Sequence, residues 1–379
     1  MRSLDRFRGC LLAGAAGDAL GFEVEFMPEE QIFQRFGESG ITEYRLRNGV
    51  AEISDDTQMT LFTATGLLLG TARGMNRGIM AKYSDYIRYS YKDWYRTQTE
   101  GFPLPSEYHY SWLVNIPKLF SRRAPGNTCL SALESDQEGT IEHPINRSKG
   151  CGGVMRVAPI GLYFCDKRLP IIESDRVGAE AAAITHGHDL GWLPAAALVH
   201  IIRRLAEEDG TSVLAAVQDA MVTIPKLLPS DYPNESYLKY LLALMQKAVD
   251  LSKENCDDLD AIHLLGRGWV AEETLAIAIY CSLKYPNDIE KALIASVNHG
   301  GDSDSTGAVT GNILGASLGM EAIPNKYLEN LELKDTIIEI ADDLFHDCKL
   351  SEYSDYEDPI WEAKYIKMSY PKLALTERE

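Results

Sequence analysis

Hydrophobic residues recur at helical spacing along most of the chain. Between Thr57 and Arg73, apolar side chains return every three or four residues, the period of a helix with one buried face. Nine further segments share this pattern: 79–95, 175–185, 193–208, 212–224, 237–253, 271–284, 289–298, 305–318 and 333–345. Convincing alternation of the kind expected of a strand is absent, and the nearest candidate, residues 41–46, is short. The pattern predicts an all-α protein of roughly a dozen helices.

The connections between these segments indicate a single domain. They are rich in Gly and Pro, and none has the length and low complexity of an interdomain linker. We expect one compact multi-helix domain over residues 1–348 and a C-terminal tail over 349–379. The tail is rich in Tyr, Asp and Glu from Ser351 onward and is predicted to be irregular.

Small residues recur every fourth position in two segments. They are Ala13, Gly17 and Gly21 near the N-terminus, and Gly307, Gly311, Gly315 and Gly319 further on. A glycine inside a helix costs about 1 kcal/mol relative to alanine, but it allows another helix to approach closely. The two stripes predict close helix packing. This packing would bring together two helix starts that carry the acidic clusters described below.

Composition narrows the class of partner. The chain carries 56 acidic against 37 basic residues, a net charge of −19, and no long basic cluster. Stable binding to nucleic acid or to an anionic membrane surface is therefore not expected. No uncharged stretch reaches the roughly 18 apolar residues of a membrane span. Seven dispersed cysteines without a CxxC pair favour a reducing, cytoplasmic location.

Two acidic clusters stand directly before predicted helices. The first is Ser-Asp-Asp-Thr at 54–57, and the second includes Asp302 and Asp304 after two glycines. Ser and Asp are ordinary helix caps, so either cluster alone has a structural explanation. One Asp suffices for a cap, however, and two neighbouring carboxylates repel each other unless a cation offsets their charge. The repetition of the arrangement favours a metal site.

The donor types indicate which metal. Four carboxylates with nearby hydroxyls, and no His or Cys at ligand spacing, favour the hard cations Mg²⁺, Mn²⁺ or Ca²⁺ over zinc. Four carboxylates exceed what one Mg²⁺ usually takes, which points to a two-metal site. The twelve-residue EF-hand loop with its terminal Glu is missing.

Five sequence blocks resemble those of a known family. They are GDALG with VEFM (17–21 and 24–27), SDDT (54–57), SKGCGGVMRVAPIG (148–161), THGH (185–188) and GGDSDSTG (300–307). In this order they resemble the signatures of the ADP-ribosylglycohydrolases, of the dinitrogenase-reductase-activating and ADP-ribosylarginine hydrolase type. The resemblance covers about residues 3–345. It implies an all-α fold with a dinuclear Mg²⁺ or Mn²⁺ centre.

The resemblance also implies roles for single residues. The catalytic residues would be Glu25, Asp56 and Asp304, with Glu25 acting as a metal ligand or as an acid/base; Asp18, in the same block as Glu25, is expected to be structural. The metals would grip the ribose 2″- and 3″-hydroxyls and acidify a bound water. The implied metal ligands are Ser54, Asp55, Asp56, Asp302, Asp304 and Ser305.

A second implied set would bind ADP-ribose. The glycine-rich loop can cradle a pyrophosphate with backbone N–H groups. Cys151 departs from relatives that have Asn or Ala there, and no basic neighbour favours its thiolate as a nucleophile. His186 is expected to contact substrate, to lie behind it, or to be a buried structural histidine, and a metal pair with His188 is disfavoured. The implied set is Asn127, Ser148, Gly150, Cys151, Gly152, Gly153, Met155 and His186.

The leading functional hypothesis is hydrolysis of the N-glycosidic bond of ADP-ribosyl-arginine on a protein, which releases ADP-ribose. Other ADP-ribosyl linkages, on serine, nucleic acid or a small molecule, are alternatives within the same chemistry. Two alternatives differ in class: a module that binds ADP-ribose without turnover, and an unrelated dimetal hydrolase of phosphate esters. A binding module would be expected to lack one of the metal-site aspartates, and all four are present.

Overall fold

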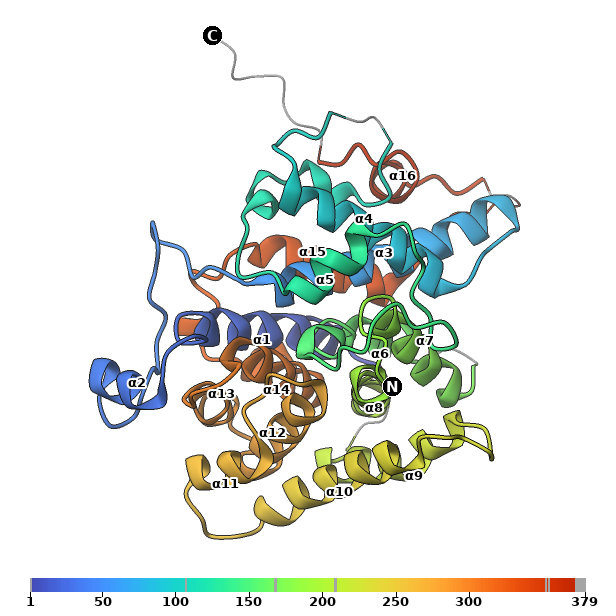
Figure 1. Ribbon diagram of the computed structural model, residues 1–379. Helices are drawn as coiled ribbons and strands as arrows, with labels where there is room; N and C mark the ends of the chain where they lie inside the picture. The colour runs from blue at the N-terminus through green and yellow to red at the C-terminus, as the bar shows by residue number, and fades with distance from the viewer. Residues whose placement is uncertain are drawn as a thin grey trace.

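The computed structural model describes residues 2–105, 108–166, 169–207, 210–351, 353 and 355–371 (Figure 1). These residues form sixteen α-helices and six short 3₁₀ helices, and they include isolated β-bridges but no strand. The all-α prediction is confirmed. The helices of the first half are α1 (Leu4–Phe22), α2 (Glu29–Phe36), α3 (Asp55–Arg77), α4 (Tyr83–Thr99), α5 (Asn127–Glu134), α6 (Ala158–Phe164), α7 (Ile171–Ala183) and α8 (Asp189–Glu207). Those of the second half are α9 (Val213–Thr223), α10 (Glu235–Leu251), α11 (Asp258–Leu265), α12 (Ala271–Lys284), α13 (Ile289–Val297), α14 (Ser303–Leu318), α15 (Lys334–His346) and α16 (Pro359–Tyr365).

Residues 41–46, the nearest candidate for a strand in the sequence, form none. The backbone N–H of Ile41 donates to Asn298 Oδ1 at 2.7 Å, and the Asn298 amide donates back to the Ile41 carbonyl at 2.9 Å. A side chain at the end of α13 thus takes both backbone groups that a neighbouring strand would pair with.

The ten predicted helical segments all fall on helices, but six observed helices are absent from that set: α1, α2, α5, α6, α11 and α16. Of the nineteen residues of α1, every one from Gly9 to Gly21 is buried. A helix buried on all sides has no polar face, so its sequence lacks amphipathic spacing. One predicted helix, 79–95, begins later than expected, at Tyr83.

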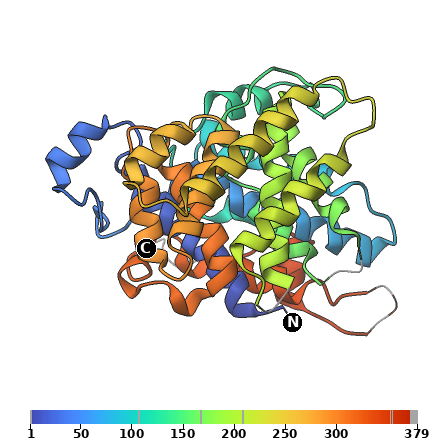
Figure 2. The ribbon, with the colours of Figure 1, turned by 90° about the horizontal axis from the view of Figure 1, so that it is seen from below.

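Helices α1 and α14 lie side by side at the centre of the molecule (Figures 1 and 2). A Cβ added to Gly17 would overlap the backbone at Gly307, and one added to Gly311 would overlap the backbone at Ala13. The close packing that the two small-residue stripes predict is confirmed. Gly319 lies just beyond α14, at a positive φ of 85° that favours glycine.

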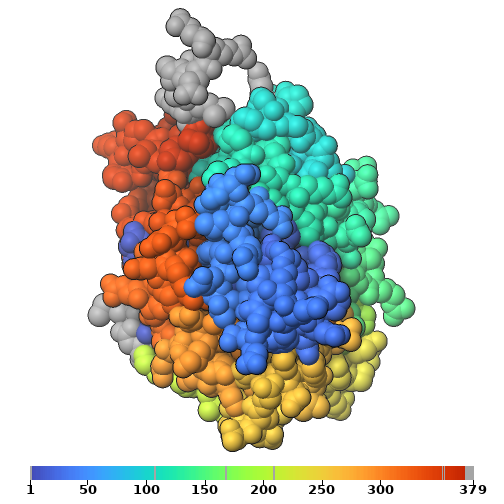
Figure 3. All heavy atoms as spheres, turned by 90° about the vertical axis from the view of Figure 1, so that its left-hand side faces the viewer, coloured from blue at the N-terminus to red at the C-terminus, as the bar shows by residue number. Residues whose placement is uncertain are grey.

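The other helices surround this central pair. Helices α12 and α13 flank α14, α15 packs on α1, and α8 is covered by α6, α7 and α9. Helix α2 stands apart from the bundle (Figure 2), and the segment between α1 and α3 covers one face of the molecule (Figure 3). No helix in the described part of the chain combines the length and the apolar composition of a membrane span.

The C-terminal segment is more regular than predicted. Helix α16 buries Trp361 and Tyr365, and the buried Lys364 forms ion pairs with Asp343 at 2.6 Å and Glu339 at 2.8 Å of α15. The tail therefore packs on the helical domain at least as far as Tyr365. Its last eight residues lie outside the described part of the chain.

Candidate active site

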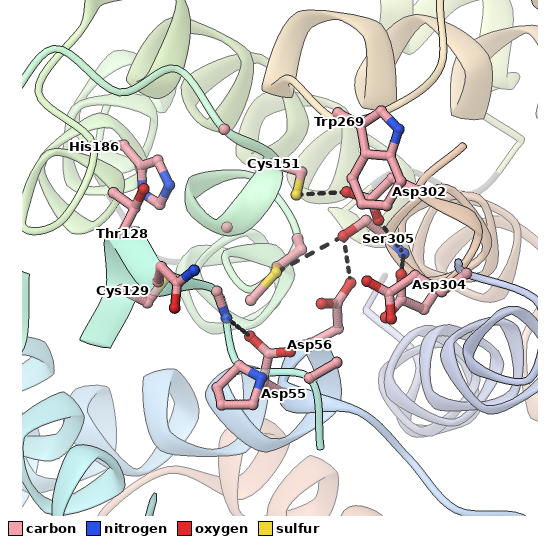
Figure 4. A pocket seen from close by; sticks show the side chains of 18 of the residues that line it. Asp55, Asp56, Thr128, Cys129, Cys151, His186, Trp269, Asp302, Asp304 and Ser305 are labelled. Carbon is pink, nitrogen blue, oxygen red and sulfur yellow. Dashed lines mark hydrogen bonds between the residues drawn. The ribbon is translucent and has the colours of Figure 1, made fainter. Parts of the chain in front are cut away.

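The starts of α3 and α14 meet. Ser54 caps α3, its Oγ accepting from the N–H of Asp56 at 3.2 Å, and Asp302 caps α14, its Oδ1 accepting from the N–H of Ser305 at 3.4 Å. Across the junction, Ser305 Oγ donates to Asp56 Oδ2 at 2.7 Å (Figure 4). The structure thus brings together the two acidic clusters, as the close packing of α14 predicts.

These clusters face a cavity of about 540 Å³, a size typical of small-molecule sites. Most of the predicted site residues line it: Glu25, Asp55, Asp56, Asn127, Gly150, Cys151, Gly152, Met155, His186, Asp302, Asp304 and Ser305. Three others do not. Ser54 is fully buried, Gly153 is buried, and Ser148 lies behind Thr128, with 3.2 Å between the two hydroxyl oxygens.

The cavity also has wall residues outside the predicted site set: Phe26, Arg122, Ala124, Pro125, Gly126, Thr128, Cys129 and Trp269. Phe26 and Trp269 stack with ring centroids 5.9 Å apart, and 72% and 40% of their surfaces are exposed. Phe26 follows Glu25 directly within the VEFM block (24–27), so the sequence resemblance points to this part of the wall. Trp269 belongs to no recognised block; its carbonyl accepts from the N–H of Cys151 at 3.3 Å, which places it on the wall.

The carboxyl groups are buried together. Asp55, Asp56, Asp302 and Asp304 are at most 5% exposed, and Glu25 is 7% exposed. Burial, and then the charge of Asp304, raises the pKa of Asp55, Asp56 and Asp302 well above the usual range, and burial raises that of Asp304 itself. The same two causes raise the pKa of Glu25 to about 11. Positive charge would let these groups ionise.

The donor set suits a hard divalent cation. All the acidic groups offer oxygen, and Glu25 Oε2 is buried without a hydrogen-bond partner. The aspartates, as placed, bond to protein donors; Asp55, for instance, accepts from the N–H of Gly126 at 3.3 Å. Consistent with this, no three His, Cys, Asp or Glu side chains of the described residues converge as a ready ligand set. Binding a cation would require the carboxylates to turn toward it.

Asp18 has a structural place, as expected. Its carboxylate is fully buried on α1 and accepts hydrogen bonds from the backbone N–H of Ser54 at 2.9 Å and of Thr57 at 3.0 Å. The Thr57 hydroxyl donates to it as well. Burial, with the charge of Asp304, raises the pKa of Asp18 to about 7. Asp18 therefore links α1 to the first turn of α3, where the acidic pair begins.

The glycine-rich loop differs in part from the prediction. The N–H of Gly150 donates to Ser148 Oγ at 3.4 Å, and the N–H of Cys151 donates to the Trp269 carbonyl, so neither is free for a pyrophosphate. The Cys151 thiol donates to Asp302 Oδ2 at 2.8 Å. Burial raises the pKa of Cys151 well above its usual range, which agrees with its not being a nucleophile.

The two histidines of the THGH block lie in different environments. His186 is 1% exposed and lies across the cavity from Asp302 and Asp304 (Figure 4). Burial, and then the charge of Arg156, lowers its pKa to about 3. His188 is not part of the cavity wall, and its Nδ1 accepts from the N–H of Leu190 at 3.0 Å. The two do not form a metal pair.

Comparison with known proteins decides the family. The sequence profile of the family described as ADP-ribosylglycohydrolase matches residues 1–353. The chain belongs to the ADP-ribosylglycohydrolase family. Its residues 54–57 and 300–307, whose side chains meet at the cavity, lie within that match.

Curated relatives and a solved structure agree with the family. The ADP-ribosyl-[dinitrogen reductase] glycohydrolase of Rhodospirillum rubrum is 26% identical, over 87% of this chain and 91% of the relative. The human ADP-ribosylhydrolase ARH3 is 25% identical, over 87% and 90% respectively. A solved ADP-ribosylglycohydrolase-related protein complex covers 90% of this chain and 98% of its own, with a TM-score of 0.56 at 23% identity, which shows a shared fold.

Membership establishes the broad reaction. As an ADP-ribosylglycohydrolase, the protein is a glycosidic hydrolase that acts on ADP-ribosylated substrates and releases ADP-ribose. The family is generally metal-dependent. The cavity between α3, α5 and α14 is thus the candidate active site of an ADP-ribosylglycohydrolase.

Proposed function

We propose that this ADP-ribosylglycohydrolase uses two divalent cations, Mg²⁺ or Mn²⁺, to cleave the N-glycosidic bond between ADP-ribose and an arginine of a protein. The observation that carries the metal dependence is the hydrogen bond from Ser305 to Asp56, because it joins two acidic helix starts into one oxygen-rich wall. The ligands would be Ser54, Asp55 and Asp56 from one start and Asp302, Asp304 and Ser305 from the other.

The bound cations would orient the ribose diol and acidify a water. Proton transfer would be carried out by side chains of the protein. The water oxygen bonds to C1″ as the bond from C1″ to the guanidine nitrogen breaks, and the nitrogen takes a proton. Glu25, which lines the cavity beside the aspartates, would supply that proton and then take up the proton that the water loses, so that its carboxyl group is restored. Asp56 and Asp304 would hold the reacting centre.

The acidic wall supports arginine as the leaving group. A guanidine that takes a proton becomes a cation, which neighbouring carboxylates stabilise, whereas a released serine hydroxyl is neutral. Arg122 is the only Lys or Arg among the described residues that line the cavity. A protein target is supported by the name of the Rhodospirillum rubrum relative, which specifies dinitrogen reductase.

The opposite wall would bind the ADP-ribosyl group. Gly150, Cys151, Gly152, Met155 and His186 line it. Asn127, the exposed first residue of α5, would lie near the leaving group, and Ser148 and Gly153 would support the loop from behind. All seven cysteines are free, which suits the proposed cytoplasmic location, and the net charge of −19 disfavours nucleic acid as a stable partner.

The test is release of free ADP-ribose from an arginine-ADP-ribosylated protein, measured with Mg²⁺, with Mn²⁺ and with EDTA. We expect metal-dependent release that Asp304→Ala abolishes. Asp335→Ala, which removes an exposed carboxylate of α15, is the matched control and should retain activity. If wild type fails with both metals yet acts on a serine-linked or nucleotide-linked substrate, the arginine proposal is wrong while the family reaction stands.

A further inference from the structure

A chain of hydrogen bonds runs behind the cavity wall to His186. It starts at Arg156, whose side chain is fully buried and stacks over the Tyr91 ring at 4.3 Å. The guanidinium donates to the Ala181 carbonyl at 3.1 Å and to Thr185 Oγ1 at 2.6 Å. A guanidinium has only donors, so Thr185 Oγ1 must be the acceptor in that bond.

This bond leaves the single hydroxyl proton of Thr185 available for donation to a second partner. Thr185 Oγ1 lies 2.8 Å from His186 Nδ1. The hydroxyl has a single proton, and because it already accepts from Arg156, that proton is free to be donated to Nδ1. The Cys129 sulfur also interacts with Thr185, but sulfur is a much weaker acceptor than an imidazole nitrogen. Nδ1 is then the acceptor, and in a neutral ring the proton must sit on Nε2.

We infer that Arg156 and Thr185 are positioning residues that hold His186 in the Nε2–H tautomer, so that His186 binds the substrate as a neutral hydrogen-bond donor. This inference rests on the proposal that the wall containing His186 binds the ADP-ribosyl group. It assigns His186 neither a metal-binding role through Nε2 nor the role of general base, because both need an unprotonated Nε2.

The surroundings of Nε2 indicate what it binds. A Cβ built on Gly150 would lie 3.3 Å from Nε2, and one built on Gly152 would lie 2.9 Å from Cε1 of the same ring. The two glycines therefore keep this edge of the ring free of side-chain contacts from the loop. Since the N–H groups of Gly150 and Cys151 donate within the protein, the imidazole would supply a donor in place of those two groups. An anionic oxygen of the pyrophosphate is the matching acceptor.

The charge state supports a donor that does not vary with pH. Burial and the nearby Arg156 keep the imidazole neutral, with its pKa lowered to about 3. The buried cation thus has two effects on the ring: its charge disfavours protonation, and its bond to Thr185 orients the one ring proton toward the cavity.

The tautomer can be measured without any turnover. In protein labelled with ¹⁵N in its eight histidine rings, the His186 signals are assigned by their loss in His186→Phe. We expect Nδ1 to resonate as unprotonated and Nε2 as protonated between about pH 5 and pH 8. A proton on Nδ1, or titration of the ring in this range, would overturn the inference, whatever substrate linkage the enzyme cleaves.

The functional arm measures binding of ADP-ribose to the metal-loaded protein by calorimetry. Loss of a hydrogen bond to a charged group predicts that His186→Phe raises the Kd by about ten- to hundredfold. Thr185→Val should raise it severalfold and change the His186 ring signals, whereas Thr185→Ser should restore both. The matched control is Thr310→Val, which removes a fully buried hydroxyl that has no hydrogen-bond partner. If Thr185→Val behaves like that control in both measurements, Thr185 has no positioning role.

Discussion

The Ser305 hydroxyl lies 2.7 Å from a carboxylate oxygen of Asp56, although the two residues are 249 positions apart in the chain. Both belong to the first turn of a helix, α14 and α3 respectively. Helix N-termini favour negative charge, which reduces the cost of burying acids there. Burial, and then the charge of Asp304, still raises the pKa of Asp56 and Asp302, so the helix termini do not fully offset these two costs and the site favours positive charge.

Removing one of these charges should stabilise the metal-free protein. We expect Asp56→Asn to raise the Tm in EDTA by about 2 °C, because it relieves repulsion while its amide oxygen still accepts from Ser305. The same variant should lose most of the Tm increase that Mn²⁺ produces in wild type, since a ligand that binds only the folded state stabilises it. Thermal unfolding with and without Mn²⁺ measures both. A lower Tm in EDTA would contradict the repulsion argument.

The raised pKa values predict a pH dependence of stability in EDTA. Folded Asp18, with a pKa of about 7, and Glu25, with a pKa of about 11, keep protons that the unfolded chain loses near pH 4. The folded state then binds more protons, so the free energy of unfolding falls as pH rises, by up to about 1.4 kcal/mol per pH unit for each such group. Denaturant unfolding between about pH 5 and pH 8 tests the sign. The stabilisation by Mn²⁺ should grow over the same interval, because cation and protons compete.

The contact between α1 and α14 should not tolerate an added methyl group. Gly311→Ala would push a Cβ into the backbone at Ala13, which no side-chain movement relieves, and should lower the free energy of unfolding by about 1–3 kcal/mol. Gly74→Ala in α3 is the matched control: its Cβ would contact only the flexible Met80 side chain at 3.3 Å, and alanine favours a helix. Urea unfolding of both compares them. Equal stabilities would show that the two helices can separate at little cost.

The C-terminal segment should contribute to the stability of the domain. Trp361 is 6% exposed, so we expect Trp361→Ala to lower the free energy of unfolding by about 3 kcal/mol. Ile360→Ala, which truncates a side chain that is 59% exposed on the same helix, should have little effect. A single unfolding transition that shifts only with Trp361→Ala would place α16 in the cooperative unit. No shift would support a separable tail beginning at residue 349.

Helix positions and the chemistry of the site were accessible from the sequence, because both are local. The spacing of apolar residues from Thr57 to Arg73 predicts α3 without knowledge of its partners, and Asp302 and Asp304 share one turn by their spacing alone. The blocks around them carry the resemblance to the ADP-ribosylglycohydrolases, and the family match bears it out. Roles that depend on bound metal and substrate stay predictions.

Other features were decided by contacts between distant segments. Helix α1 has no amphipathic pattern because it is buried on all sides. Ile41, in the nearest candidate for a strand, bonds through its backbone groups to the Asn298 side chain instead. Trp269 reaches the cavity through its bond to Cys151.

The tautomer of His186 is also decided by contacts between segments that are distant in the sequence. The THGH block shows that a histidine is present, but only the fold places the buried Arg156 against Thr185 and so determines which ring nitrogen holds the proton. A hydrogen bond depends on where both partners lie, to a few tenths of an ångström. The sequence by itself determined which groups are available, and the packing of α1, α3 and α14 decided which of them meet.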